Sequence, residues 1–516
     1  MLSDVDLVLL LLVATTLLAV LAQRLKIAYP IVLVLGGVAL GLVPGLPRIA
    51  LDPTLAFDLF LPPLLFSGAF FMPWPEFKAN LRPILLLAVG LVAATTVAVA
   101  YVAWATISLP LAVGFVLGAI VSPPDAIAAT AIAHRLGLPH RLVVVLEGES
   151  LINDAAGLVL FRFAVAAVVT GAFSVPAAGL EFVRLALGGI ALGLAVAWLA
   201  LWLLRRLVDP DIVTVLTLLA PFAAYLPAEL LGFSGVLATV AAGIYAGWHA
   251  PTSFTPEARV HAGAVWSTFV FLLNGLAFIL IGLQLPFILA EIAHQPPALL
   301  GAAALAVIGV VIVVRIAWVF GVNWLTRRLV PRLRRDAPPW QSLAVLSWAG
   351  MRGIVSLAAA LALPDAIASG APFPQRGLVL FLAFCVILVT LVLQGLTLPA
   401  LVRGLGVVSS AHDEERLEAR RLALEAALMR LDELALRDDL PADGLAHLRQ
   451  RYEHALRVLD ERDLEAGDVE THQRVQRDLI DAERKLLLDM RRHNAISDDI
   501  FRELEHMLDL RATWLG

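Results

Sequence analysis

Long apolar stretches recur along the first 400 residues, and most are long enough to cross a bilayer as a helix, which takes about 20 residues. The chain is 60% hydrophobic and 16% charged, whereas soluble domains carry about 25% charged residues. A soluble fold cannot bury that much apolar surface, so we expect an all-α membrane protein with thirteen transmembrane helices. The thirteen stretches lie near 5–22, 28–46, 52–70, 81–107, 111–136, 141–170, 180–205, 211–228, 234–249, 261–285, 299–325, 341–363 and 377–402.

The charged residues are concentrated at the C-terminal end. Residues 411–516 carry 26 of the 43 Asp and Glu residues and 17 of the 38 Lys and Arg residues. Apolar residues recur there at three- and four-residue spacing, which is typical of amphipathic helices in water. We therefore predict a transmembrane domain over 1–408 and a cytoplasmic helical tail over 409–516.

The loops between the apolar stretches indicate which side of the membrane each one faces. Fifteen Lys and Arg residues follow odd-numbered stretches and three follow even-numbered ones. Because basic residues collect in cytoplasmic loops, this alternation places the N-terminus outside and the tail in the cytoplasm. We expect a multi-pass protein of an energised membrane such as the plasma (inner) membrane, with the lipid bilayer as its surroundings and no nucleic-acid partner.

Two of the thirteen stretches contain residues that interrupt a helix. The fifth holds Pro123 and Pro124, which lack the N–H that a helix needs. The twelfth has Gly350 and Gly353 on either side of Arg352, and glycine tolerates an unwound backbone. Since the interrupted stretches are seven apart, we expect two inverted six-helix repeats whose broken helices cross, with a site near the middle of the membrane.

Carboxylates follow in the next stretch, within the run EGESLINDAAG. Ser150 and Asp154 are four residues apart and share one helical face, and Glu149 and Asn153 share an adjacent face. Asp125 lies at the break that precedes them. Carboxylates, hydroxyls and free carbonyls are the oxygen ligands of a small alkali cation. A carboxylate removed from water is stabilised by a proton or by a cation, and competition between the two for one site produces exchange.

These residues resemble a known family. ESLIND at 149–154 is similar to the ESxxND motif of sodium/proton exchangers in the cation/proton antiporter superfamily, in the branch with asparagine before the essential aspartate. LPPLLF at 61–66, SPPDA at 122–126 and GMRG at 350–353 extend the resemblance over all thirteen stretches.

The resemblance implies a role for each residue of the site. Asp154 would bind the ion or the proton, and Asn153 would support it. Asp125 and Ser150 would provide further cation ligands, with the carbonyl of Pro124 beside them. The transported species would be Na⁺, or Li⁺ or K⁺, and H⁺, without a cofactor, in an electroneutral one-for-one exchange with alternating access.

The same resemblance implies a structural framework around the ion. Glu149 would pair with Arg315, and Arg352 would offset the negative helix ends where the broken helices cross. Both arginines lie within apolar stretches and therefore need anionic partners. The family also implies a homodimer with a six-helix core that moves against a dimerisation part.

The chain departs from the family at positions that bear on ion selectivity. Pro124 and Ala126 stand where relatives usually have threonine and proline, and Ser67 stands where many have glutamate. The sequence assigns no role to Glu147, and it leaves Arg162 to pair with a partner or to reach the membrane surface.

Two other functions remain open from the sequence. Two membrane-buried aspartates could activate a water molecule in an intramembrane aspartyl protease, but neither Asp125 nor Asp154 lies in a YD or GxGD motif. A cation channel would need a continuous wet path with rings of ligands from repeated subunits. We therefore expect a transporter and not an enzyme.

Overall fold

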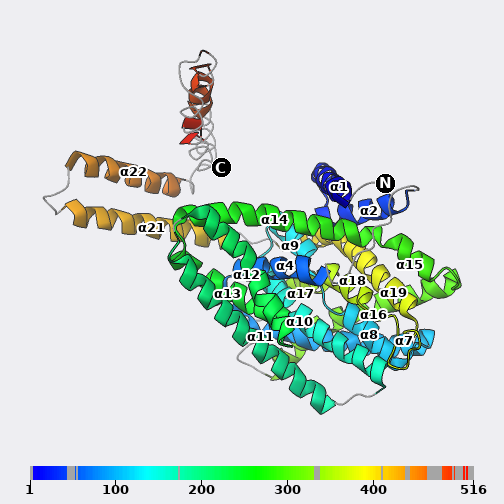
Figure 1. Cartoon of the computed structure of the whole chain (residues 1–516). Coiled ribbons are helices and arrows are strands. Elements are labelled where there is room, and N and C mark those ends of the chain that lie inside the picture. The colour runs from blue at the N-terminus through cyan, green and yellow to red at the C-terminus, as the bar shows by residue number, and fades with distance from the viewer. Residues whose placement is uncertain are drawn as a thin grey trace. The chain divides into compact units, whose positions relative to one another are not determined.

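The protein is described here by a computed structural model of the whole chain (Figure 1). The structure describes residues 4–43, 53, 56–171, 175–207, 209–329, 338–407, 411–435 and 442–461, with short pieces between 479 and 508. The chain forms two compact units, Met1–Ser409 and Ser410–Gly516.

Helices make up the first unit. In chain order they are α1 (Asp4–Leu25), α2 (Tyr29–Gly41), η1 (Ala56–Phe60), α4 (Leu61–Phe70), α5 (Trp74–Ala79), α6 (Leu81–Leu85), η2 (Leu86–Leu91), α7 (Val92–Ile107), α8 (Leu111–Val121), α9 (Ala126–Leu136), α10 (His140–Thr170), α11 (Val175–Leu204), α12 (Pro210–Leu230), α13 (Gly235–Ser253), α14 (Pro256–Leu283), α15 (Leu285–Glu291), α16 (Pro297–Leu329), α17 (Trp340–Trp348), α18 (Ile354–Leu361), α19 (Arg376–Val389), η4 (Thr390–Gln394) and α20 (Gly395–Leu405). The three segments named η are π-helical.

Nine helices in the described part of the chain are long and apolar enough to cross a membrane, which is fewer than the thirteen stretches expected. Two further apolar helices, Tyr29–Gly41 and Ala56–Phe70, are shorter. The interrupted twelfth stretch is divided into α17 and α18, so neither half reaches the length of a span. Three of the four missing spans are therefore short or broken helices, and the fourth, α13 (Gly235–Ser253), is long enough at 19 residues but not apolar enough.

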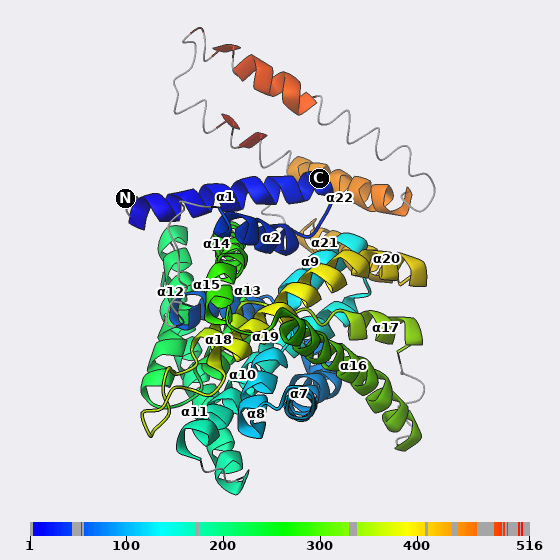
Figure 2. The same cartoon turned by 90° about the vertical axis from the view of Figure 1, so that its right-hand side faces the viewer.

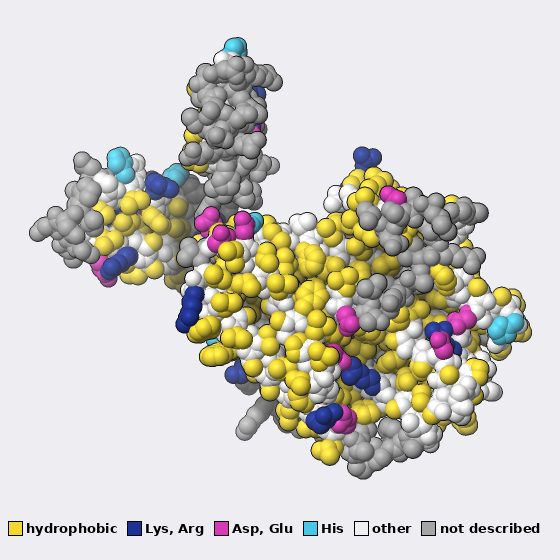
Figure 3. Space-filling model, viewed as in Figure 1, with side chains coloured by type: hydrophobic (Ala, Val, Ile, Leu, Met, Phe, Trp, Pro, Cys, Tyr) yellow, Lys and Arg dark blue, Asp and Glu magenta, His cyan; other side chains and the backbone are white. Residues whose placement is uncertain are grey.

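Small residues allow the helices of this unit to pack closely. A Cβ at Gly114 or Gly118 of α8 would press against the α7 backbone at Ala100 and Thr96. Close approach through small residues is how helices associate in lipid, where the hydrophobic effect does not drive them together. On the face seen in Figure 3, the unit consists mostly of hydrophobic side chains with a few scattered charged groups.

Helix α10 runs through the middle of the first unit. Helices α11, α12 and α13 lie on one side of it, and α16 lies on the other (Figures 1 and 2). Helix α10 contacts α8, α9, α17 and α18, so the residues of the EGESLINDAAG run meet both interrupted stretches.

The second unit contains α21 (Ala411–Ala435) and α22 (Ala442–Glu461), and residues 479–487 are also helical. Helices α21 and α22 contact each other, and an ion pair joins Asp432 of α21 to Arg449 of α22. These two helices thus form a helical hairpin.

Candidate functional site

Three polar residues of α10 are buried in the first unit. Glu149 and Asn153 are fully buried, and Asp154 is 8% exposed. An unbroken helix from His140 to Thr170 holds them, so their spacing of four and five residues directs them to neighbouring faces. Burying these groups is costly unless each has a partner or a ligand.

The two breaks meet beside these residues. The backbone N–H of Asp125, between α8 and α9, donates a 2.7 Å hydrogen bond to the carbonyl of Met351, between α17 and α18. A Cβ at Gly353 would collide with the Asp125 carboxylate, and one at Gly157 of α10 would collide with the Pro123 ring. Glycine at 353 and 157 is therefore what lets the two breaks and α10 approach one another.

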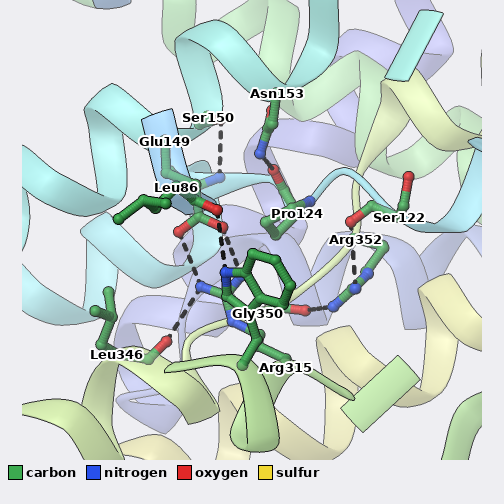
Figure 4. A network of polar contacts seen from close by, with 12 residues as sticks. Leu86, Ser122, Pro124, Glu149, Ser150, Asn153, Arg315, Leu346, Gly350 and Arg352 are labelled. Atoms are coloured by element: carbon green, nitrogen blue, oxygen red, sulfur yellow. Dashed lines mark hydrogen bonds and ion pairs between the residues drawn. The ribbon is translucent and has the colours of Figure 1, made fainter. Parts of the chain in front are cut away.

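Side chains from α10 hold the first break in place. The Asn153 amide donates a 2.8 Å hydrogen bond to the carbonyl of Pro124, and the Ser150 hydroxyl accepts a 3.3 Å hydrogen bond from the N–H of Ala126 (Figure 4). One oxygen of Asp125 accepts from the N–H of Ile127 at 2.8 Å and caps α9. The structure thus brings together the five predicted ion-site residues: Pro124, Asp125, Ser150, Asn153 and Asp154.

Asp154 differs from its neighbours in its contacts. Among the described residues, none donates a hydrogen bond to its carboxylate, and the charged group that acts on it is the Asp125 carboxylate. Two like charges out of water repel each other, so a bound cation or proton stabilises the pair. The arrangement can therefore bind a small cation or a proton reversibly.

Glu149 makes a separate, fully buried ion pair. The two terminal nitrogens of Arg315 on α16 donate to its two carboxylate oxygens at 2.6 and 3.0 Å. Both side chains are 1% exposed. Arg315 also donates at 3.1 Å to the carbonyl of Leu346, near the C-terminal end of α17 (Figure 4). The forked geometry is that of a strong charge-assisted contact.

Arg352 lies at the crossing but binds carbonyls. Its Nε donates at 2.9 Å to Val121, the last residue of α8, and its terminal nitrogens donate to Ser122 and Gly350. These contacts put the guanidinium at the negative end of the α8 dipole, which is the role that the resemblance implied, and no carboxylate of a described residue bonds to it directly. Arg352 therefore belongs to the helix ends and not to the Glu149 ion pair.

Three polar residues near the site were not found from the sequence. The Tyr29 hydroxyl on α2 interacts electrostatically with Asp125 and shares a hydrogen bond with the side chain of Asn274 on α14. The Thr390 hydroxyl in η4 accepts from the N–H of Arg352 at 3.2 Å. Each is a lone polar residue in an apolar stretch, and only that weak signal marks it.

The residues that the sequence left open lie at other positions. Ser67 is buried, and its hydroxyl donates to the carbonyl of Leu64 in its own helix at 2.9 Å. Arg162 pairs with Glu229 of α12 at 2.7 Å. Glu147 is half-buried on α10.

Comparisons with known proteins agree on one family. Residues 8–404 match the family described as "Sodium/hydrogen exchanger, transmembrane". An uncharacterized Na⁺/H⁺ exchanger of Mycobacterium tuberculosis is 38% identical over 509 residues, covering 96% of this chain and 93% of that protein. A sodium, potassium, lithium and rubidium/H⁺ antiporter of Bacillus pumilus is 37% identical over 391 residues, covering 73% of this chain and 58% of the antiporter.

A solved structure has the same fold. The sodium proton antiporter MjNhaP1 of Methanocaldococcus jannaschii superposes with a TM-score of 0.60 at 21% identity, covering 78% of this chain and 98% of that one. The sequence match covers all the polar residues described above, from Tyr29 to Thr390. The chain is a member of the transmembrane sodium/hydrogen exchanger family.

Proposed function

We propose that this protein exchanges Na⁺, or Li⁺ or K⁺, for H⁺ across a membrane, with Asp154 binding the cation and the proton in competition. The observation that carries the proposal is the contrast within α10. Glu149 has a permanent arginine partner, whereas no protein donor within the described chain contacts Asp154. A buried carboxylate without a partner is stabilised by whichever positive species arrives.

The surrounding groups suit a cation at this position. Asp125 has one oxygen engaged by the α9 N-terminus, which leaves the second for a ligand. The Ser150 hydroxyl oxygen and the Pro124 carbonyl lie beside it. Each accepts one hydrogen bond from the described residues and so retains a lone pair. Oxygen donors of this kind replace the water shell of an alkali cation.

Exchange follows because moving the unoccupied, ionised site across the membrane is costly. A carrier whose Asp154 is ionised and unoccupied would have to move a bare charge through a low-dielectric region. Binding one Na⁺ or one H⁺ removes that charge, so the two loaded forms alternate between the two sides. One carboxylate that takes one cation or one proton predicts an electroneutral one-for-one cycle.

The test measures proton movement driven by cations in everted vesicles or proteoliposomes. A pH-sensitive dye reports collapse of a proton gradient on addition of Na⁺, Li⁺ or K⁺ over a range of pH. We expect the native protein to respond and Asp154→Asn to be inactive, because an amide can neither take up a proton nor compensate a cation charge. Asp365→Asn is the matched control, since Asp365 is 95% exposed and pairs with Arg376.

The outcomes are decisive. An inactive native protein, or an Asp154→Asn variant as active as Asp365→Asn, would overturn the proposal. The order of the cation responses supplies the selectivity. Net charge movement that ion substitution does not remove would contradict an electroneutral cycle.

We also propose thirteen transmembrane segments built as two inverted six-helix repeats. Support comes from adding α2, the η1–α4 segment, α13 and the α17–α18 pair to the nine long helices. The alternation of basic loops supports an external N-terminus and a cytoplasmic tail over 409–516 in the plasma (inner) membrane. Fusing a reporter active on one side only after each loop tests this topology.

A homodimer is the assembly we propose. Of the candidate spans, Asp6–Leu25 and Gly179–Leu204 are among the least buried within one chain, so they offer apolar faces for a second copy. Cross-linking between single cysteines placed on these helices in the membrane tests the dimer.

A further inference from the structure

A second polar site lies beside α10, away from the crossing. A cavity of about 370 Å³ is bounded by residues of η1, α10, α12 and α13, and its lining includes four ionisable side chains: Asp58, Arg162, Tyr225 and Glu229. The charges of Asp58, Arg162 and Glu229 all act on the Tyr225 hydroxyl, so the four groups form one cluster. Nothing in the crossing of the broken helices requires this cluster.

An ion pair that spans two parts of the fold closes one side of this cavity. Arg162 of α10 donates to one oxygen of Glu229, at the end of α12, at 2.7 Å. The other oxygen of Glu229 accepts a 2.9 Å hydrogen bond from the N–H of Gly235, which begins α13. Glu229 is thus anchored to the α12–α13 turn, and Arg162 reaches it from the helix that carries Asp154.

The cavity follows the face of α10 that leads to Asp154. Asp154, Leu158 and Arg162 are spaced four residues apart on an unbroken helix, so they lie on one face over about 12 Å. Leu158 and Ala155 line the cavity. Leu158 is half-buried and Ala155 is buried, and Ala155 follows Asp154 directly in the chain, so the cavity lining reaches α10 one residue from Asp154.

The Arg162–Glu229 pair is easier to separate than the other ion pair of α10. The side chains of Arg162 and Glu229 are 51% and 28% exposed, whereas those of Arg315 and Glu149 are 1% exposed. An ion pair in contact with water is weak, because water solvates both charges when they separate. A buried pair is held together by the cost of leaving either charge alone.

We infer that this cavity is the outer vestibule of the ion path. While the vestibule is closed, the Arg162 guanidinium pairs with the Glu229 carboxylate. This pair, which we call the lock, separates when the vestibule opens toward Asp154. The inference rests on the proposed function and on the proposed topology, which places the Thr170 end of α10 outside. Movement of α10 relative to the α12–α13 turn must break the Arg162–Glu229 contact.

Loss of the Arg162–Glu229 contact should affect ion binding from one side of the membrane only. The loss stabilises no bound ion directly, but it raises the fraction of protein that is open to the outside. A larger competent fraction lowers the apparent half-saturating Na⁺ concentration on that side only. The expected change is about two- to fivefold, the size associated with an exposed ion pair.

The experiment uses the full-length protein in membranes, with Cys385, the single cysteine, replaced by alanine and Leu158→Cys introduced. A membrane-impermeant maleimide is applied from either side, and Na⁺ half-saturation is measured from either side. The tested variants are Arg162→Gln and Glu229→Gln, the second of which keeps an acceptor for the Gly235 N–H. Glu181→Gln is the matched control, because Glu181 and its partner Arg184 lie one turn apart on α11, both side chains are exposed, and the substitution leaves the hydrogen bond from Arg184 to the Gly232 carbonyl in place.

We expect Leu158→Cys to react from the outer side, and to react several times faster in both lock variants than with Glu181→Gln. In both lock variants the half-saturating Na⁺ concentration measured from the outer side should fall, and the one measured from the cytoplasmic side should not change. Reaction from the cytoplasmic side alone, or lock variants that match Glu181→Gln in both measurements, overturns the inference. If one lock variant does not assemble, the other decides, and the side from which Leu158→Cys reacts tests the vestibule without either.

Failure of this inference is distinguishable from failure of the proposed function. Asp154→Asn is assayed in the same vesicles. If the native protein exchanges, Asp154→Asn does not and the lock variants behave as the control, the lock alone is wrong. If the native protein moves no protons on addition of cations, the proposed function is wrong as well.

Discussion

The charged residues of α10 show how differently one helix can treat similar side chains. Glu149 pairs with Arg315 in a fully buried ion pair, Asp154 receives no hydrogen bond from a described residue, and Arg162 pairs with Glu229 in a partly exposed ion pair. Each arrangement follows from the neighbours that the fold places beside the residue, and not from the residue type. A permanent partner belongs where water is absent, because separation there is costly.

Glu149→Gln should reduce stability strongly while leaving the site residues unchanged. The substitution leaves the Arg315 guanidinium buried without its anion, which costs roughly 3–5 kcal/mol when a buried pair loses one partner. Thermal unfolding in detergent measures the loss, with Glu181→Gln as the exposed control, for which we expect little change. The double variant Glu149→Leu, Arg315→Met should recover part of the stability, and a double variant as unstable as the single one would contradict this reading.

Half-helices, taken as elements, create the electrostatics of the crossing. The C-terminal ends of α8 and α17 meet Arg352 and Arg315, whose guanidinium groups bind the carbonyls of Val121 and Leu346. The N-terminal end of α9 meets Asp125. Opposite charges at each helix end offset the dipoles, which stabilises the two broken helices inside the unit. Asp154 is the group that still lacks an opposite charge beside it.

Gly353→Ala tests the close contact between the two breaks. The added Cβ would overlap the Asp125 carboxylate, so either the break or Asp125 must move. We expect exchange to be lost, or the half-saturating Na⁺ concentration to rise about tenfold or more, since displacing one charged ligand contact costs on the order of 1.5–3 kcal/mol.

Gly309→Ala in α16 is the control for Gly353→Ala. Nothing lies near the position where its Cβ would be added, and alanine favours a helix over glycine by up to about 1 kcal/mol. Dye assays and thermal unfolding of both variants separate ion binding from stability. Normal exchange in Gly353→Ala would show that the two breaks do not need to approach this closely.

Across the whole molecule, the residues of the site and the cavity belong to one of two compact units. All of them fall within Met1–Ser409, and the family match covers 8–404. The second unit includes a hairpin of α21 and α22 with an ion pair of its own. The candidate ion-site residues therefore all lie in the first unit.

Ending the chain after Ser409 should preserve exchange. Because no site residue is removed, we expect the half-saturating Na⁺ concentration to stay within about twofold of the full-length value, a change of less than about 0.4 kcal/mol. Dye dequenching in vesicles with matched protein amounts measures it. Loss of exchange by a shortened chain that still inserts and remains folded would show that the tail contributes to transport.

Amino-acid order alone determined much of this protein. The apolar stretches required an all-helical membrane protein, because backbone groups in lipid must be bonded within the segment. Pro123, Pro124, Gly350 and Gly353 marked both broken helices, since these residue types act locally on the backbone. The ESLIND motif pointed to sodium/proton exchange, which agrees with the family match. It also pointed to Asp154 as the ion-binding residue, which stays a prediction.

Other features were decided only by the tertiary structure. Tyr29, Asn274 and Thr390 reach the site from distant stretches. Arg162 and Glu229 are 67 residues apart and share a cavity with Asp58. Helical periodicity reports which residues share a face of one helix, but it carries no information about which helix lies opposite. Partners between helices therefore emerge only when the bundle is assembled.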